Sequence, residues 1–413
     1  MSPQDFSTNV LVVGGAFAGL SAITSLQNHI SERCKYSNAF SSRSHKLSIT
    51  VIEPRAGLLN ILGIPHAVLD PEFAQSQYLP LHEMKTLHIE TVHTPFGELI
   101  QQVRPKVYDE AAFSIHFVQG KVTNVARDYV DYHLVESRTI KRIKFDYIVL
   151  AMGRDRLWPI TPDALTADTF LDEMNKTKNI LELKSSISIV GGGAVGIEMA
   201  GCLKRNFPDK CVRIIHPHDR LLPEPLSNEL KDTIFTSLTS YGVDVMLNTR
   251  IKEELDNGYL VTTTNDTIKS DLTIWCTNFR NNLDILDDVV YSKAITNHQN
   301  LAVNEYLQIE VAGDVLDNVF AIGDIVELDI IKSAGWAMYM GRQTANNIAS
   351  DIFEGKLAEK IPDMKTVPRG MVIVAGNEEI VSELSGEVEV NNRNYVEEYK
   401  DYCMGKIRVT IGV

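Results

Sequence analysis

The chain has 413 residues, enough for two or three domains with ordinary hydrophobic cores. Its 54 acidic residues outnumber its 40 basic ones, and the formal net charge is −14. An acidic surface repels the phosphates of nucleic acids and of anionic lipids, so the composition disfavours both as main partners. It favours a soluble, acidic enzyme.

The cysteine pattern and the N-terminus indicate the compartment. Five cysteines are scattered along the chain in no C-x-x-C pair, which is typical of a protein from a reducing compartment. They are Cys34, Cys202, Cys211, Cys276 and Cys403. The N-terminus has no signal-peptide pattern, Ser2 stands where N-myristoylation requires glycine, and no run of about 18 apolar residues is present. We expect a cytoplasmic protein with no transmembrane segment, and peripheral membrane contact stays open.

The first elements form a strand–turn–helix–strand pattern. Residues 9–13 (NVLVV) are an apolar strand, a helix-like stretch follows the turn, and residues 47–52 are a second strand closed by Glu53. The turn reads Gly14, Gly15, Ala16, Phe17, Ala18 and Gly19. In a dinucleotide-binding βαβ unit, such a turn exposes the helix N-terminus to a pyrophosphate, and the acid binds a ribose. Ala16 replaces the usual middle glycine, and Glu53 has the alternative of a surface acid before a proline turn.

The same pattern recurs at mid-chain with an intact G-x-G-x-x-G turn. Strand 187–190 (ISIV) leads into Gly191, Gly193 and Gly196, which permit a tight turn, close approach of a pyrophosphate and close helix packing. The second strand, 212–215, is closed by His216, where an acid would favour NADH. Two further cationic side chains, His218 and Arg220, make NADPH admissible. A capping or packing role for His216 is equally consistent with the sequence.

Three more strands end in residues suited to a cofactor. Strand 145–150 ends in Ala151-Met152-Gly153-Arg154, strand 272–276 in Thr277-Asn278, and strand 319–322 in Gly323-Asp324. An aspartate at a strand end can bond the ribityl hydroxyls of a flavin. The helix expected at 333–352 then points its positive end at the flavin's pyrimidine edge.

Other stretches are predicted to lie outside the two patterns. Residues 28–46 and 81–112 are expected as surface loops inserted into the first fold. From about residue 360, short alternating strands such as MVIVAG and GKIRVTIGV indicate a third, small α+β domain.

Several absences narrow the chemistry. Without a cysteine pair, electrons cannot pass from a flavin to a protein disulfide. No H-E-x-x-H motif or clustered Cys and His residues indicate a metal, and no G-x-S-x-G turn is present. His82, His88 and His93 fit no common ligand spacing and are interpreted as surface or loop residues.

Together these motifs resemble the pyridine nucleotide–disulfide reductase superfamily of FAD- and NAD(P)H-dependent oxidoreductases. Within it, the chain is similar to the apoptosis-inducing-factor-like branch, which includes ferroptosis suppressor protein and fungal relatives. The stretches that resemble it are VLVVGGAFAGL, ILGIPHAVLDPEFAQSQYLP, FVQGKVTNV, YIVLAMGR, SIVGGGAVGIEMAG and NVFAIGDI. The resemblance implies an α/β fold with two Rossmann-like domains. It implies an FAD domain of residues 1–157 and 280–356, an NAD(P)H domain of 158–279 and a C-terminal α+β domain of 357–413.

The resemblance also implies the site residues. For FAD they are Gly14, Gly15, Ala16, Phe17, Ala18, Gly19, Glu53, Pro54, Arg55, Pro65, His66, Val122, Met152, Gly153, Gly323, Asp324, Ala334, Gly335 and Trp336. For NAD(P)H they are Gly191, Gly193, Val195, Gly196, Glu198, His216, Thr277 and Asn278. Three residues depart from the family pattern: Asn278 replaces a glycine, His66 stands where many relatives have arginine, and Trp336 is unusual at its position.

The implied activity is an FAD-dependent oxidoreductase that takes hydride from NAD(P)H and reduces a quinone, another small organic acceptor or oxygen. One alternative is a flavin-dependent tailoring oxidase or oxygenase of a small-molecule pathway. Another is a non-catalytic flavoprotein that senses NAD(P)H. The sequence assigns no catalytic acid or base, although Glu198 could neighbour the nicotinamide. It also leaves open whether the chain forms a homodimer.

Overall fold

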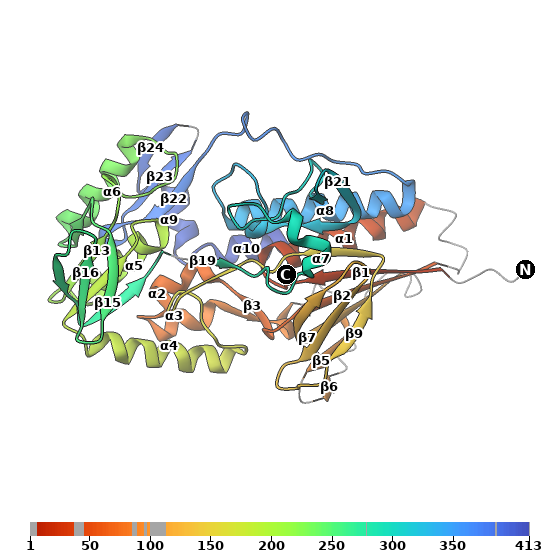
Figure 1. The fold of residues 1–413 in the computed structure, drawn as a ribbon, viewed down its shortest axis with the longest axis horizontal. Coiled ribbons are helices and arrows are strands. Elements are labelled where there is room, and N and C mark those ends of the chain that lie inside the picture. The colour runs from red at the N-terminus through yellow and green to blue at the C-terminus, as the bar shows by residue number, and fades with distance from the viewer. Residues whose placement is uncertain are drawn as a thin grey trace, which may run out of the picture.

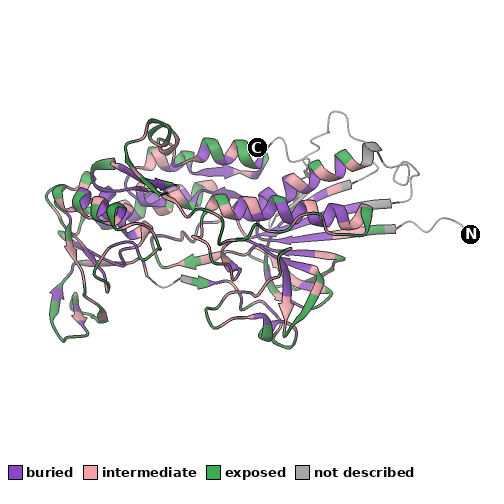
Figure 2. Ribbon diagram, turned by 90° about the horizontal axis from the view of Figure 1, so that it is seen from above, coloured by how far each residue is buried: buried purple, intermediate pink, exposed green. Residues whose placement is uncertain are grey.

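A computed structural model describes residues 6–36, 45–84, 89–94, 97–99, 113–277, 279–384 and 386–412. They fold around two mainly parallel sheets, one toward each end of the long axis in Figure 1. Buried residues gather in the strands and on the inner faces of the flanking helices (Figure 2). The predicted α/β class with two Rossmann-like folds is confirmed, whereas the domain boundaries stay a prediction.

The unit around the larger sheet, which we call the N-terminal dinucleotide fold, is built on β1, α1 and β2. Its sheet has the order β20-β21-β10-β1-β2-β7-β5-β6, and β21, β10, β1, β2 and β7 run parallel. Because helices cover the faces of a parallel sheet, Val10 through Val13 of β1 are all at most 3% exposed. The elements are β1 (Phe6–Val13), α1 (Phe17–Tyr36), β2 (His45–Glu53), β5 (Ile89–Thr94), β6 (Gly97–Leu99), β7 (Phe113–Val125), β8 (Tyr129–Leu134), β9 (Lys141–Lys144), β10 (Tyr147–Leu150), β20 (Gln308–Val311) and β21 (Asp314–Ala321).

Helix α8 (Ala334–Glu354) lies beside α1 (Figure 1). The two backbones approach closely at Gly341, where a Cβ atom would lie only 2.5 Å from the Ala18 carbonyl oxygen. The Ser21 hydroxyl also donates to the Met338 carbonyl oxygen at 2.7 Å. The first turns of α8 are thereby held next to the first turns of α1, at the glycine turn. The predicted helix at 333–352 is confirmed.

The mid-chain dinucleotide fold is built on β12, α5 and β13. Its sheet has the order β14-β13-β12-β18, and all neighbouring strands are parallel. A separate antiparallel sheet, β15-β16-β17, extends from it. The elements are α4 (Ala167–Glu182), β12 (Ser186–Val190), α5 (Ala194–Asn206), β13 (Cys211–Ile215), α6 (Asn228–Ser240), β14 (Asp244–Met246), β15 (Ile251–Leu255), β16 (Tyr259–Thr262), β17 (Thr267–Lys269) and β18 (Leu272–Trp275).

Two kinds of segment join the folds. Strands β11 (Arg154–Arg156) and β19 (Phe279–Asn281), where the chain crosses between the folds, pair as an antiparallel ribbon. A segment that follows β2 instead packs its helices against α4 and α5 of the mid-chain fold. It contains β3 (Gly57–Leu59), α2 (Ile64–Ala67), α3 (Pro71–Ser76) and β4 (Tyr78–Pro80). A short helix, α7 (Asp288–Tyr291), follows the ribbon.

The C-terminal region is α+β, as predicted, but one predicted strand is wrong. Residues 405–412 of GKIRVTIGV belong mainly to α10 (Met404–Ile411). The alternation of Ile407, Val409 and Ile411 suggested a strand, yet Val409 is 82% exposed while Met404, Ile407 and Ile411 are buried at helical spacing. Helix α10 packs on α1, and the antiparallel sheet β22-β23-β24 packs on α5 and α6. The remaining elements are β22 (Met371–Val374), β23 (Ile380–Leu384), β24 (Glu387–Val390) and α9 (Arg393–Tyr399).

Both predicted insertion loops need correction within the described residues. Helix α1 continues to Tyr36, so residues 28–36 are helical, and β2 begins at His45. Within 81–112, β5 and β6 add to the edge of the large sheet. Loop predictions failed because polar residues on an exposed helix face or an edge strand resemble loop composition. Among the described helices, none is both long and apolar enough to cross a membrane.

Candidate functional site

The N-terminal glycine turn has the backbone geometry that the sequence predicts. Gly14 has φ +103°, and a Cβ atom there would lie 2.3 Å from the Ala151 carbonyl oxygen. At Gly19 a Cβ atom would lie 1.9 Å from the Gly14 carbonyl oxygen, so both positions require glycine. Ala16 is exposed, with no positive φ. Its methyl group is therefore accommodated without strain at the mouth of the turn, while Phe17 behind it is buried.

Glu53 lies directly against this turn. Its Oε2 accepts a hydrogen bond from the Gly15 backbone N–H at 2.8 Å, and its Oε1 accepts from the Arg55 N–H at 3.0 Å. Only 8% of Glu53 is exposed, so the carboxylate is fixed at the end of β2 by two backbone donors. The Arg55 guanidinium donates to the Pro162 carbonyl oxygen at 2.8 Å, and the Pro54 carbonyl oxygen accepts from Gln119 at 3.2 Å. The surface-acid alternative for Glu53 does not hold.

The strand ends predicted to share the FAD site do meet at one edge of the sheet. A Cβ atom on Gly14 would lie 3.2 Å from the Met152 backbone nitrogen, and one on Gly323 would lie 3.4 Å from the Ala18 Cβ. Gly153 has φ +61° and nothing within 4 Å of its Cβ position, so its backbone faces open space. Val122 lies on β7, and its side chain is buried.

Two basic residues at this edge were not assigned to the site by the sequence analysis. Arg154 Nε lies 2.9 Å from Asp324 Oδ2, and Arg154 Nη2 donates to the Asp324 carbonyl oxygen at 2.9 Å. Lys332 Nζ donates to the Val326 carbonyl oxygen, and burial lowers the pKa of Lys332 to about 8 despite the nearby Asp324 charge. Arg154 directly follows the predicted Met152-Gly153 pair and Lys332 directly precedes the cap of α8. These two positions in the sequence could have identified both residues as candidates for the site.

The first turn of α8 borders the same edge. Ser333 caps the helix, and its hydroxyl accepts from the Trp336 N–H at 3.3 Å. Gly335 is exposed, Ala334 and Trp336 are half-buried, and Trp336 packs edge-on against Tyr339 with ring centroids 5.5 Å apart. The free N–H groups of this turn are available to an electron-rich group.

Pro65 and His66 lie on α2, which packs against α5 rather than on the N-terminal turn. The His66 ring meets Phe73 edge-on at 4.4 Å and stacks with Tyr402 at 6.0 Å. Burial is the main cause that lowers the pKa of His66, and Asp70, 3.7 Å away, opposes it. Tyr402 comes from the C-terminal region, and no sequence signal pointed to this contact.

The mid-chain turn repeats the first turn closely. Gly191 has φ +119°, and a Cβ atom on Gly196 would lie 1.9 Å from the Gly191 carbonyl oxygen. At Gly193 the nearest atom to a Cβ position is the Cδ of Pro223, 4.0 Å away, so the backbone is open to a ligand. Thr277 contacts the turn, since its Cγ2 would lie 2.9 Å from a Cβ atom on Gly191. Val195 is half-buried on the first turn of α5, and Asn278 lies outside the described residues.

Glu198 lies one turn further along α5 and is half-buried. Its Oε1 accepts a long hydrogen bond, 3.4 Å, from the Val374 N–H. Burial raises the pKa of Glu198 to about 8, and this single backbone donor only partly opposes the shift. The side chain is therefore mainly protonated at neutral pH.

This raised pKa predicts a pH-dependent effect of Glu198→Gln. Because the folded pKa lies above the ordinary 4.5, the stability that neutral Glu198 contributes is complete below pH 4.5 and is lost as the pH rises through 8. Relative to the variant, we expect wild-type protein to lose about 2 kcal/mol of unfolding free energy between pH 5 and pH 7. Urea unfolding at the two pH values measures it. Parallel pH profiles for the two proteins would contradict the shift.

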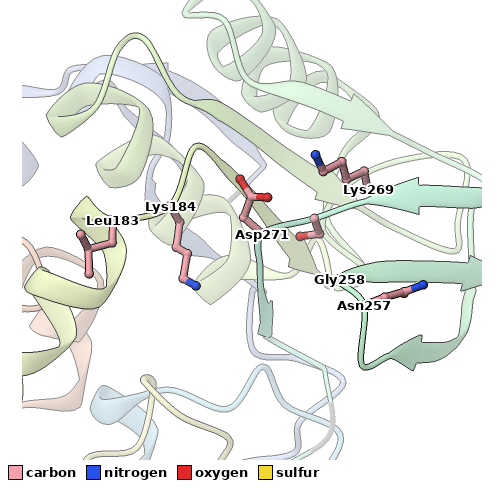
Figure 3. A pocket seen from close by; sticks show the side chains of 7 residues that line it. Leu183, Lys184, Asn257, Gly258, Lys269 and Asp271 are labelled. Atoms are coloured by element: carbon pink, nitrogen blue, oxygen red, sulfur yellow. The ribbon is translucent and has the colours of Figure 1, made fainter.

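A surface cavity of about 460 Å³ is lined by residues that include Leu183, Lys184 and Asp271 (Figure 3). Its Asp271 carboxylate accepts from the backbone N–H groups of Ser185 and Ser186 at 3.2 and 2.9 Å, where β12 begins. The Gly191 turn follows the opposite end of β12. Ligands of open parallel sheets bind at the carboxyl ends of the strands, so this cavity is not the dinucleotide site.

Comparison with known proteins agrees with this geometry. A family model for pyridine nucleotide-disulphide oxidoreductases matches residues 8–341, and the chain belongs to that family. It is an oxidoreductase of a family that uses FAD and NAD(P)H. It is 28% identical over 401 residues to oxidoreductase OXR1 of Ajellomyces capsulatus, covering 89% of this chain and 79% of that protein.

More distant similarities cover nearly the whole chain. It is 22% identical over 394 residues to ferroptosis suppressor protein 1 of Xenopus tropicalis, covering 92% and 89% of the two chains. The structure of NDH2 from Plasmodium falciparum in complex with NADH matches with a TM-score of 0.66 and 13% identity, covering 98% and 96%. The chain lies in the apoptosis-inducing-factor and ferroptosis-suppressor branch, as its motifs indicated.

The residues present fit both cofactors. At the N-terminal turn, the open backbone at Gly153 and the fixed Glu53 carboxylate suit a pyrophosphate and a ribose. The exposed backbone at Gly193 suits a second diphosphate at the N-terminus of α5. We therefore propose that the residues at the first turn bind FAD and that those at the second turn bind NAD(P)H.

Proposed function

We propose that this protein passes reducing equivalents from NAD(P)H, through FAD, directly to a small quinone-like acceptor. The observation that carries the proposal is the state of its cysteines. The four that the structure describes, Cys202, Cys211, Cys276 and Cys403, are all free. A dithiol relay between flavin and substrate needs two neighbouring cysteines, and these four include no bonded pair.

Three of these four thiols are also weakly acidic. Burial raises the pKa of Cys202 and of Cys276 to about 12, and that of Cys403 to about 11. Thiolates, not thiols, attack disulfides and donate charge to a flavin, so these side chains contribute neither reaction at neutral pH. These observations support an acceptor that takes electrons from the flavin itself.

A cavity of about 200 Å³ supports a small aromatic acceptor. It lies at the first turn of α8, next to the proposed flavin site. Side chains on its walls are mostly apolar, with an ion pair between Arg369 and Asp329 at 2.7 Å. They include Ile330, Ile331, Trp336, Met364, Val367 and Leu384. It is smaller than the roughly 300–1,000 Å³ of ordinary ligand pockets, which favours a single ring.

The bound cofactors supply the chemistry: hydride passes from the nicotinamide to the flavin, and the reduced flavin reduces the acceptor. The chain supplies position and charge. Glu53 and Asp324 would orient the sugar parts of FAD, and the N-terminus of α8 would stabilise negative charge on the flavin ring. On the nicotinamide side, Gly193 would admit the diphosphate, and protonated Glu198, one turn along α5, adds no negative charge there.

Anaerobic stopped-flow spectroscopy tests the proposal with the purified flavoprotein. NADPH or NADH should bleach the flavin band, and a short-chain quinone should then restore it faster than oxygen or a disulfide such as lipoamide does. Restoration mainly by oxygen would support the oxidase alternative. No bleaching with either nicotinamide would contradict the proposal.

Replacing Leu384 by glutamate tests where the acceptor binds. Leu384 is 43% exposed at the wall of the 200 Å³ cavity, so the change adds a charge there without disturbing the core. We expect the KM for the quinone to rise about tenfold, corresponding to about 1.4 kcal/mol, with unchanged flavin reduction by NAD(P)H. The matched control is Val390→Glu on neighbouring β24, 45% exposed and outside the cavity lining. Equal KM values for both variants would place the acceptor elsewhere.

A further inference from the structure

The two dinucleotide folds use different side chains at the same structural position. Glu53 ends β2 and His216 follows β13, so each closes the second strand of its βαβ unit. The Gly15 N–H donates to Glu53 Oε2 at 2.8 Å, and the Gly192 N–H donates to His216 Nδ1 at 3.1 Å. The His216 imidazole thus accepts a hydrogen bond from the second glycine of the mid-chain turn. The Glu53 carboxylate accepts the equivalent hydrogen bond in the N-terminal turn.

His216 makes this bond as an uncharged group. Its side chain is enclosed, with 4% of the residue exposed, and Leu221 and Gly192 pack beside it. The pKa of His216 is lowered to about 4, mainly by burial and in addition by His218 and Lys231, while a backbone hydrogen bond with Arg220 opposes the shift. Because Nδ1 accepts the Gly192 hydrogen bond, the single ring proton is on Nε2.

Basic side chains lie near His216, among them Arg220 and Lys231. The His218 ring lies 5.1 Å from the His216 ring and is exposed. Arg220 pairs with Asp232 at 3.1 Å, but both side chains are substantially exposed, so this pair is weak and the guanidinium can turn to another anion. The acidic residues of this loop are the exposed Asp219 and the half-buried Glu224. A carboxylate at position 216 would repel a 2′-phosphate, whereas a neutral ring with the Arg220 guanidinium nearby does not.

We propose that His216 sets the nucleotide specificity of the mid-chain site and makes it prefer NADPH to NADH. The inference rests on the proposed assignment of this fold to the nicotinamide nucleotide. His216 retains the structural hydrogen bond to Gly192 and removes the negative charge. His218 and Arg220 then face the added phosphate of NADPH.

Binding of two adenosine fragments to the flavin-loaded protein tests the inference apart from catalysis. The probes are 2′,5′-ADP and 5′-AMP, which differ only in the 2′-phosphate, and isothermal titration calorimetry measures both. We expect wild-type protein to bind 2′,5′-ADP at least tenfold more tightly. His216→Glu should reverse this ratio, because the glutamate can accept from Gly192 N–H as Glu53 accepts from Gly15. His216→Gln, a neutral acceptor, should preserve it.

A second variant keeps the test independent of folding at the buried position. Arg220→Gln lies on the surface and should weaken 2′,5′-ADP binding about fivefold while 5′-AMP binding stays unchanged. Equal binding of the two fragments to wild-type protein, or an unaltered ratio in His216→Glu, would overturn the inference and leave the nucleotide site intact. Binding of neither fragment would overturn the site assignment together with the inference.

Discussion

Replacing Gly193 by valine is expected to weaken NAD(P)H binding about 100-fold while the protein keeps its fold and its FAD. Gly193 is the residue before α5, with φ −83° and ψ −179°, a conformation that valine adopts readily. Its Cβ would meet only Pro223 at 4.0 Å, so the side chain projects into open space. That space is where the diphosphate must approach the free N–H groups of the helix. Losing this approach costs about 2–3 kcal/mol, which corresponds to the stated change in Kd.

Two other variants separate this effect from damage to the fold. Gly193→Ala should change the Kd by less than tenfold, because the exposed Ala16 shows that the equivalent turn accommodates a methyl group. Gly196→Ala should instead destabilise the fold, since its Cβ would lie 1.9 Å from the Gly191 carbonyl oxygen. Flavin quenching titrations give the Kd values, and thermal unfolding reports stability. A valine variant with wild-type affinity would show that the nucleotide does not bind at this turn.

Much of this site could be predicted because its signals are local. Glycine is required at fixed spacing by the positive φ of Gly14 and Gly191 and by the close helix contacts at Gly19 and Gly196. Short sequence motifs therefore predict this backbone geometry. The positions of Glu53 and His216 could be predicted because each residue closes the second strand of its βαβ unit. The meeting of strand ends from distant parts of the chain then follows from parallel sheet topology.

What the sequence could not predict depends on contacts between distant segments. The Tyr402–His66 stack joins the C-terminal region to α2, and neither residue has a pattern that identifies its partner. The state of His216 is also invisible in sequence, because its neutral charge results from burial beside the glycine turn. Helix α10 was mistaken for a strand because a short apolar run satisfies both periodicities, and only its packing on α1 decides between them.

Asp324→Asn is expected to destabilise the protein by about 2–3 kcal/mol and to leave most of the purified chain without FAD. The change removes the negative charge opposite Arg154, whose side chain is only 11% exposed. Breaking a fully buried ion pair from one side typically costs about 3–5 kcal/mol. Here the cost is smaller, because 31% of the Asp324 side chain is exposed and Arg154 keeps its bond to the Asp324 carbonyl oxygen. Urea unfolding and the ratio of flavin to protein absorbance measure the two effects.

The double variant Arg154→Gln, Asp324→Asn distinguishes a structural ion pair from a flavin ligand. With no buried unpaired charge, it should recover most of the lost stability, because the penalty of a broken pair lies mainly in the partner left behind. If Asp324 also binds the ribityl chain, the double variant folds yet still fails to retain FAD. If the pair only supports the sheet edge, FAD content recovers together with stability. We expect the first outcome, since Asp324 follows Gly323, whose φ of +79° turns the strand end toward Ala18 and the N-terminal glycine turn.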